Sequence, residues 1–162
     1  MKFTTRRFIR GDIDEVLDIE AYSFDQPWAR KDFVTLLRHP NVVNRVALID
    51  GVIVAYASIE LYGRRADILN FAVRWDYRRQ GIGREFLRHL RHTSLNDRSA
   101  ISFAVSEYNA SGQIFLRSCK FRVTSIMREH YEGSDEDSYY FEWVPGQPPQ
   151  KYLPCNRISG YI

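Results

Sequence analysis

Two glycines and three arginines stand together in residues 78–84, Arg-Arg-Gln-Gly-Ile-Gly-Arg, where an apolar run gives way to a helical pattern. At the start of a helix the first N–H groups lack intrahelical partners, and the helix dipole adds about half a positive charge. Glycine lets the backbone approach an anion without a Cβ atom, and guanidinium groups match phosphate oxygens. These residues therefore predict a binding site for a diphosphate.

The segment differs from two familiar phosphate-binding motifs. The GK[ST] ending of a P-loop is absent, and Phe86 stands where GxGxxG needs its third glycine. Tight packing of a strand against a helix is the alternative explanation for Gly81 and Gly83, because a residue without a side chain lets two elements approach closely. The spacing alone leaves both explanations open.

Arginine dominates the basic residues, with nineteen Arg and four Lys in a chain of formal net charge +3. Arginine binds phosphate better than lysine does, so a phosphorylated ligand fits this choice, although an arginine-rich proteome would give the same count. A basic RNA-associated domain is a further interpretation. It ranks last because stacking motifs such as RNP1 are absent, and we expect no nucleic-acid partner.

Length and composition indicate one globular domain, since 44% of the 162 residues are apolar and 27% are charged. Cys119 and Cys155 lack CxxC or metal-ligand spacing, and the pair His89 and His92 has no third ligand at a useful spacing. The N-terminal segment lacks the apolar core of a signal peptide, and no apolar run approaches the roughly 20 residues that span a bilayer. We expect a cytoplasmic protein without a metal or a membrane partner.

Hydrophobic periodicity predicts the elements along the chain. We expect a strand at 3–8, helices at about 12–24 and 30–39, and three strands within 45–73. Asp50-Gly51 predicts the first hairpin, because both turn positions need positive φ. A helix after Gly83, a strand at 100–105, a helix capped by Asn109 and strands near 121–131 and 138–144 complete the order.

The expected order, β-α-α-β-β-β-α-β-α-β-β, predicts an α+β fold in which helices cover a mixed, mostly antiparallel sheet of six or seven strands as an α/β/α sandwich. We expect the domain to span residues 1–144. Residues 145–162, which contain Pro148, Pro149 and Pro154, are expected to form an extended C-terminal tail.

Residues 78–83 resemble the Q/R-x-x-G-x-G/A pyrophosphate loop of the GNAT N-acetyltransferases, and residues 68–90 resemble the RimI-type branch, which acetylates protein N-termini. The resemblance extends from about Phe3 to Trp143 and includes "YSFDQPW" between the first two helices. It implies the GNAT fold, in which the fourth and fifth strands splay apart. It also implies an acetyl-CoA-dependent N-acetyltransferase acting on a protein N-terminus, a lysine or a small-molecule amine.

The resemblance also implies how acetyl-CoA is bound. The backbone of the fourth strand would bind the pantetheine arm, the loop N–H groups would wrap the pyrophosphate, and Asn109 would touch the cosubstrate as well as cap its helix. The implied set is Phe71, Ala72, Val73, Arg78, Arg79, Gln80, Gly81, Ile82, Gly83, Arg84 and Asn109.

The catalytic pair implied by the resemblance is missing. RimI-type enzymes use a Glu on the fifth strand as base and a Tyr on the next helix as acid, and these positions hold Ala104 and Leu116. Neither side chain can move a proton. The alternative is therefore a GNAT-fold module that binds CoA or a protein with little transferase activity.

Three residues are candidates for the missing base: Glu60, Asp67 and His130. Each carboxylate could equally be an ordinary solvated charge, and the same holds for Glu107. His130 resembles one of the two aromatic residues at the peptide entrance of RimI-like enzymes, and a histidine titrates near neutrality.

Other residues are candidates for the leaving group and the acceptor. Tyr108 and Ser111 are possible proton donors to the departing thiolate. Phe24, Trp28 and Tyr131 are the predicted acceptor contacts, and the protein is expected to be a monomer or a homodimer.

Overall fold

The computed structural model describes residues 3–95, 97–128 and 136–147, and within them seven strands form one sheet of order β1-β2-β3-β4-β5-β7-β6. The strands are β1 (Thr4–Arg7), β2 (Val42–Ile49), β3 (Val52–Tyr62), β4 (Arg65–Val73), β5 (Ala100–Ser106), β6 (Arg122–Met127) and β7 (Ser138–Trp143). The helices are α1 (Ile13–Ala21), α2 (Arg30–Arg38), α3 (Ile82–Thr93) and α4 (Ala110–Ser118), with 3-10 turns η1 (Arg10–Asp12) and η2 (Trp75–Tyr77). The predicted order and the α+β class are confirmed.

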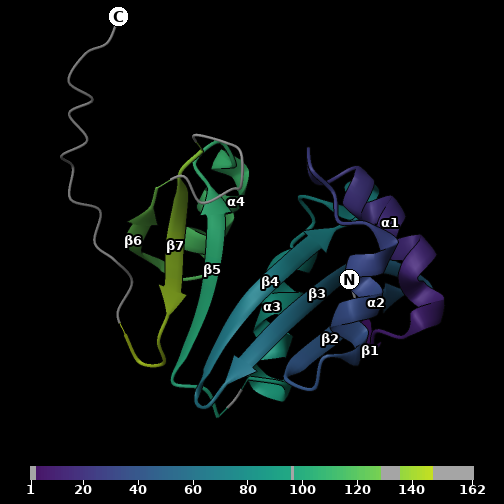
Figure 1. Ribbon diagram of the computed structural model, residues 1–162, viewed down its shortest axis with the longest axis horizontal. Coiled ribbons are helices and arrows are strands. Elements are labelled where there is room, and N and C mark those ends of the chain that lie inside the picture. Colours follow the sequence, from purple (N-terminus) through teal and green to yellow (C-terminus); the bar gives the residue numbers. More distant parts are fainter. Residues whose placement is uncertain (1–2, 96, 129–135, 148–162) are drawn as a thin grey trace, which may run out of the picture.

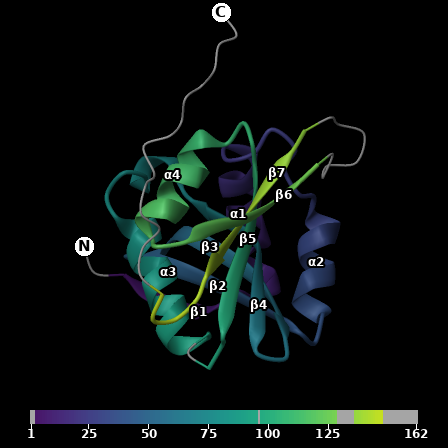
Figure 2. The same ribbon diagram turned by 90° about the vertical axis from the view of Figure 1, so that its left-hand side faces the viewer.

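Helices cover both faces of the sheet, so the predicted three-layer arrangement is also confirmed (Figures 1 and 2). The residues Ile82, Phe86, Leu87 and Leu90 recur at helical spacing and bury one face of α3 in the larger core. On the opposite face of the sheet, Ile13, Val16 and Ile19 of α1 pack with Phe33 of α2 in a second core.

The hairpin between β2 and β3 follows its sequence signal. Asp50 and Gly51 have φ values of 49° and 83°, and Ile49 pairs with Val52 across the turn. Both residue types tolerate the left-handed region that this two-residue turn requires. The strand β2 begins at Val42, three residues before the expected start.

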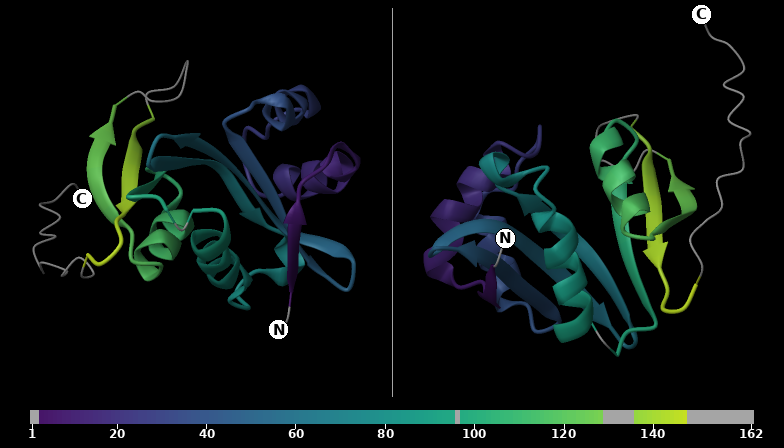
Figure 3. Two further views of the ribbon diagram at one scale, coloured as in Figure 1. Left: turned by 90° about the horizontal axis from the view of Figure 1, so that it is seen from below. Right: turned by 180° about the vertical axis from the view of Figure 1, so that it is seen from behind.

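The parallel strands β4 and β5 pair over only part of their length. The ladder joins Arg65–Ile68 to Ala100–Phe103, after which β4 continues to Val73 and β5 to Ser106 without pairing with each other. The divergence is visible in Figure 1 and again from below and behind in Figure 3. A bulge in the β3–β4 ladder, between the pairs Ser58–Asn70 and Ile59–Ile68, leaves Leu69 without an opposite residue. The expected splay of the fourth and fifth strands is therefore present.

Several predicted features lie in parts of the chain that the structure does not describe. The predicted tail at 145–162 falls mostly outside the described residues, as do His130, Tyr131 and Cys155. Among the residues that are described, no helix is both long enough and apolar enough to cross a membrane.

Candidate active site

A cavity of about 630 Å³ opens between the C-terminal half of β4, the loop before α3, and α4. Every residue of the predicted acetyl-CoA set except Gln80 lines it, because Gln80 donates its side-chain amide to the carbonyl of Asp76, 2.9 Å away. The remaining lining comes from Ser23, Phe24, Tyr77, Ser111, Gly112, Ile114, Phe115 and Ser118.

The loop before α3 has the backbone conformation of an anion site. Arg79 and Gly81 both have positive φ, 62° and 81°, on either side of Gln80. Successive residues that alternate in this way turn their N–H groups towards one concave surface. Gly81 is also the N-cap of α3, and no side chain caps this helix. The helix N-terminus and the loop therefore present N–H groups to the same cavity.

The two glycines are required for different reasons. A Cβ atom on Gly81 would meet nothing within 4 Å, so only its positive φ favours glycine. A Cβ atom on Gly83 would lie 3.3 Å from both Phe115 Cε2 and Val73 Cγ2, where the helix crosses β4 and α4. The anion-binding explanation thus applies to Gly81, and the close-packing explanation applies to Gly83.

The splayed edge of β4 exposes backbone groups at alternate residues. The N–H of Arg74 donates to Val54 O, which places Ala72, paired with Tyr56, on the side that bonds β3. By the alternation of an antiparallel ladder, Phe71 and Val73 direct their N–H and C=O groups towards the splay. Of the three predicted pantetheine contacts, Phe71 and Val73 have the required orientation and Ala72 does not.

Arg78 connects two segments of the chain at the rim of the cavity. Its Nε donates to Val73 O at 2.8 Å and its Nη2 to Ser23 Oγ at 2.7 Å, and its guanidinium lies 5.4 Å from the centre of the Trp75 ring. Burial lowers the pKa of Arg78 from its ordinary value. This side chain fixes the segment after α1 against the end of β4.

Asn109 caps α4, as predicted. Its Oδ1 accepts a hydrogen bond from Gly112 N at 2.8 Å, and the residue also lines the cavity. A contact between Asn109 and the cosubstrate stays a prediction.

The residues at the two missing catalytic positions lie in different surroundings. Ala104 on β5 is exposed and lies opposite Tyr140 of β7. Leu116 is 1% exposed and belongs to the core under α4, so its side chain does not face the splay.

A cluster of hydroxyl groups around Asp67 lies beside Ala104. Tyr62 Oη donates to Asp67 Oδ2 at 2.7 Å, Tyr140 Oη donates to Asp67 Oδ1 at 2.9 Å, and Ser102 Oγ donates to the same oxygen. Asp67 immediately precedes Ile68, the last β4 residue that pairs with β5. The carboxylate therefore lies at the closed end of the splay.

The two tyrosines of this cluster keep their protons more firmly than free phenols do. Burial raises the pKa of Tyr140, and its hydrogen bond to Asp67 adds to the rise. Burial also raises the pKa of Tyr62, and the same carboxylate adds to it. Glu60, which pairs opposite Asp67, accepts from the described residues only a long contact of 3.4 Å, donated by Tyr62 Oη.

The buried carboxylate of Glu20 was not identified from the sequence. Glu20 is 1% exposed and accepts hydrogen bonds from Tyr56 Oη, from Asn70 Nδ2 at 3.1 Å and from Trp28 N at 2.9 Å. Burial raises the pKa of Glu20, and the bonds from Trp28 and Asn70 oppose the rise. Its place in the helix was the available signal, since Ile13, Val16 and Glu20 share one face of α1.

The predicted acceptor residues separate into different surroundings. Phe24 lines the cavity, whereas Trp28 is half-buried and packs its ring 5.6 Å from that of Phe33.

The remaining candidates for proton transfer also differ in their surroundings. Glu107 accepts from Asp137 N at 3.0 Å, which ties the end of β5 to the start of β7. Ser111 lines the cavity, and Tyr108 is largely exposed.

In the part of the chain that the structure describes, potential metal-ligating side chains form no group of three. His89 instead shares a hydrogen bond of 2.7 Å between its Nε2 and Thr5 Oγ1.

Comparison with known proteins agrees with this geometry. Residues 13–121 match the model of the acetyltransferase (GNAT) family. A putative ribosomal protein bS18-alanine N-acetyltransferase of Bacillus subtilis is 29% identical over 145 residues, which cover 88% of this chain and 95% of that protein. The corresponding enzyme of Escherichia coli K12 is 29% identical over 76% of this chain and 84% of its own.

Solved structures show the same fold. The crystal structure of the Escherichia coli ribosomal-protein-S18-alanine N-acetyltransferase superposes with a TM-score of 0.79 at 25% identity, covering 93% of this chain and 98% of that chain. The crystal structure of Arabidopsis thaliana NAA60 in complex with acetyl-CoA superposes with a TM-score of 0.74 at 15% identity, covering 90% of this chain and 100% of that chain.

These matches decide between the two functions left open by Ala104 and Leu116, since the related proteins are named N-acetyltransferases. The alternating loop residues and the part of β4 that does not pair with β5 fit a cosubstrate with a diphosphate and a pantetheine arm. The chain belongs to the acetyltransferase (GNAT) family, and it is an acetyl-CoA-dependent N-acetyltransferase that transfers an acetyl group to a primary amine.

Proposed function

We propose that the protein acetylates the N-terminal amine of another protein and that Asp67 receives the proton of that amine. The relatives from Bacillus subtilis and Escherichia coli, whose names specify a ribosomal-protein alanine, support a polypeptide acceptor. They also fit the cytoplasmic location predicted from the cysteines. The cavity along β4 binds acetyl-CoA through the loop before α3, and the acceptor reaches the thioester at the splay.

The cluster around Asp67 is the observation that carries the catalytic proposal. During transfer the amine nitrogen bonds to the thioester carbonyl carbon, the C–S bond breaks, and the nitrogen must lose a proton. Tyr140 Oη donates to Asp67, so its oxygen can accept the amine proton while its own proton passes to the carboxylate. Tyr140 ends unchanged and Asp67 ends protonated. The route replaces the carboxylate missing at Ala104, which lies opposite Tyr140.

The catalytic proposal is tested by steady-state kinetics of Asp67→Asn and Tyr140→Phe. We expect Asp67→Asn to lower kcat by about 100-fold or more, the usual range for a lost general base, while KM for acetyl-CoA stays within about twofold. Glu60→Gln is the matched control, because Glu60 lies opposite Asp67 and keeps only the long contact with Tyr62.

Two kinetic outcomes would assign the base differently. A near-normal kcat for Asp67→Asn together with a large loss in His130→Ala would move the role to His130, the remaining candidate, which lies outside the described residues. A large loss in Glu60→Gln would move it to Glu60.

The acceptor class is tested separately by thiol release and mass spectrometry. Three substrates separate the possibilities: a peptide with a free N-terminal alanine, the same peptide N-acetylated with one internal lysine, and a polyamine. We expect acetylation of the free N-terminus and at least about tenfold lower kcat/KM for the other two, because the acceptor must enter as an extended chain end. Preferential modification of the lysine or the polyamine would contradict the proposal.

A further inference from the structure

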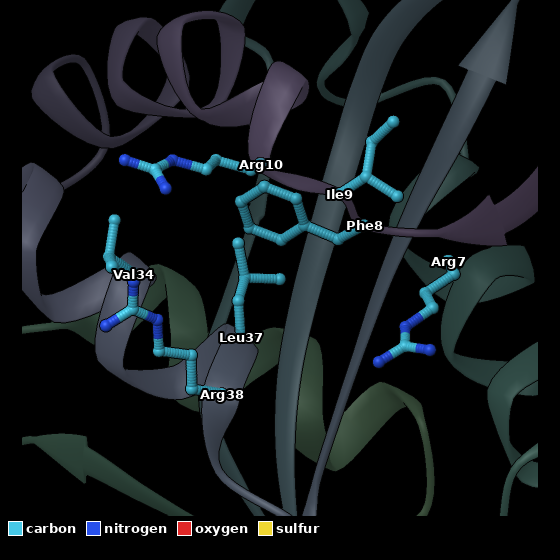
Figure 4. A pocket seen from close by; sticks show the side chains of 7 residues that line it. All are labelled: Arg7, Phe8, Ile9, Arg10, Val34, Leu37 and Arg38. Carbon is cyan, nitrogen blue, oxygen red and sulfur yellow. The ribbon is translucent and has the colours of Figure 1, made fainter.

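A second cavity, of about 330 Å³, lies at the far edge of the sheet between η1 and α2. Phe8, Val34 and Leu37 provide its apolar surface, and Ile9 adds a 53% exposed side chain at the rim. The guanidinium groups of Arg10 and Arg38 point to the same side of this cavity, and Arg7 lies at the other end, with Phe8 and Leu37 between them (Figure 4). We call these seven lining residues the basic cavity.

The positive charge of the basic cavity is not balanced by neighbouring carboxylates. Asp12 is held by Arg6 at 2.6 Å, Asp14 pairs with Arg30, and Asp32 accepts from Ala29 N at 2.8 Å. In the described part of the chain, the side chains of Arg7, Arg10 and Arg38 have no ion pair. Three uncompensated guanidinium groups around one hollow favour an anionic ligand, and their planar forks suit carboxylates.

The apolar surface of the basic cavity argues against a nucleic acid. Single-stranded nucleic acids stack their bases on exposed aromatic rings. Phe8, the aromatic residue that lines this cavity, is 1% exposed and contacts Phe33 at 5.8 Å between ring centres. Aliphatic carbons of Val34, Leu37 and Ile9 instead match a bulky aliphatic side chain. The ligand that fits both features carries carboxylates and an aliphatic group.

The edge of the sheet beside the cavity can hold an extended chain. The strand β1 lies at one end of the sheet and pairs only with β2, so its outer N–H and C=O groups lack a strand partner among the described residues. Peptides commonly bind by adding a strand to such an edge, with alternate side chains entering pockets. The strand ends at Arg7, where the basic cavity begins.

We propose that the basic cavity and the outer edge of β1 bind an extended acidic segment of a partner protein, with an aliphatic side chain of that segment inserted against Val34 and Leu37. The site is separate from the acetyl-CoA cavity, because three strand spacings, about 14 Å, separate β1 from β4. The partner is therefore recognised without occupying the splay. Binding and catalysis are independent in this arrangement.

Fluorescence anisotropy with a labelled hexapeptide tests the proposal. The probe Glu-Asp-Leu-Glu-Leu-Asp carries an acetylated N-terminus and no lysine, so it cannot serve as an acceptor. We expect saturable binding that weakens as salt is raised, because exposed charges are screened within about 10 Å at 0.1 M salt. Arg38→Gln should weaken it about tenfold or more, the effect of one lost charge-assisted hydrogen bond. Leu37→Ser should weaken it similarly.

Matched controls separate this site from general attraction to a basic protein. Arg64→Gln removes the same charge from an exposed residue at the β3–β4 turn, and it should change the affinity by less than about twofold. Arg38→Glu changes an exposed residue and leaves the apolar surface of the basic cavity intact. It should abolish binding even if Leu37→Ser unfolds the protein. Asp67→Asn should bind the probe as the wild type does, whatever happens to its activity.

Several results would overturn the proposal. Equal affinity for a probe in which both leucines are serine would mean that the apolar surface of the basic cavity does not contribute to binding. Equal affinity for an RNA hexamer would point to polyanion binding, and no loss in Arg38→Gln would remove the site. Absence of saturable binding by the wild type would do the same.

Discussion

The donor side and the acceptor side of the active site are built from different parts of the chain. On the donor side, all but one of the residues predicted to bind acetyl-CoA lie between Phe71 and Arg84, and the predicted contacts are mainly backbone groups. On the acceptor side, Asp67, Ser102, Tyr62 and Tyr140 bring side chains from four strands to one point. A diphosphate needs converging N–H groups, which one turn can supply, whereas a proton acceptor needs one carboxylate in a suitable place.

The proposal that Asp67 is the base implies that one donor site can be combined with proton acceptors on different strands. The donor loop has two residues with positive φ, and at Gly83 a Cβ atom would lie in tight contact, 3.3 Å, with the side chains of Phe115 and Val73. Under the proposal the proton acceptor lies on β4 instead of β5, and a carboxylate on either of these adjacent strands would reach the same end of the splay. In this protein β5 holds Ala104, and β4 holds Asp67.

The largest expected effect comes from moving the carboxylate back to β5. In the Asp67→Asn background, Ala104→Glu should recover at least about tenfold of the lost kcat, a fraction of the 100-fold or greater contribution of a general base. The new carboxylate lies opposite Tyr140 and can accept a hydrogen bond from the Tyr140 hydroxyl. Measurement is by steady-state kinetics at saturating acetyl-CoA.

Ala104→Gln in the same background is the control, because it adds equal volume without a base. If the Glu and Gln variants have equal kcat, Asp67 and residue 104 do not serve the same proton, and the comparison between the two strands fails.

The second effect concerns the donor side at Gly83. Gly83→Val places a branched side chain where even a Cβ atom lies 3.3 Å from Phe115 and Val73, and overpacking of this kind costs about 1–3 kcal/mol. We expect the dissociation constant of CoA to rise about tenfold or more, because Phe115 and Val73 line the cavity. Calorimetric titration measures it, with Gly83→Ala as the milder variant. An unchanged affinity would show that the crossing of α3 with β4 does not shape the cavity.

The same contrast explains how much could be predicted from the sequence. The fold was predictable because Asp50-Gly51, the apolar face of α3 and Asn109 are local signals, each read from a few adjacent residues. The part of the cavity lining between Phe71 and Arg84 was predictable because the resemblance to the GNAT loop covers contiguous residues. The hydroxyl cluster was not, because the contact between Tyr140 and Asp67 depends on how β5 and β7 align next to β4.

Two details of the donor side also needed three-dimensional information. Arg78 was expected at the diphosphate, but its fork binds Val73 O and Ser23 Oγ. Ala72 was expected to bind the pantetheine arm, but its backbone groups face β3. Both depend on side-chain direction and ladder alternation, which residue type does not specify.

A smaller effect on the donor side is expected at Gly81. Gly81→Ala meets no neighbour within 4 Å, so its cost is the left-handed conformation at φ 81°, about 1 kcal/mol for an alanine. We expect CoA binding to weaken about fivefold, and Gly81→Asn to weaken it less, since asparagine tolerates this region. Calorimetric titration of both variants measures the difference. Equal weakening by Ala and Asn would mean that the loop needs the absence of a side chain there, as Gly83 does.

The smallest effect concerns Glu20, which joins α1, β3 and the bulged β4 on the acceptor side of the sheet. Burial raises its pKa, so the folded protein binds this proton more tightly than the unfolded chain does. The resulting stability is present below the ordinary pKa of 4.5 and is lost as the pH rises through the folded value. Glu20→Gln cannot titrate. The free energy of unfolding of the wild type minus that of Glu20→Gln should therefore fall as the pH rises above about 4.5, by less than about 1.4 kcal/mol per pH unit. Urea unfolding at a series of pH values measures this difference, and a value that is constant or rises with pH would contradict a carboxyl group whose proton is held by burial.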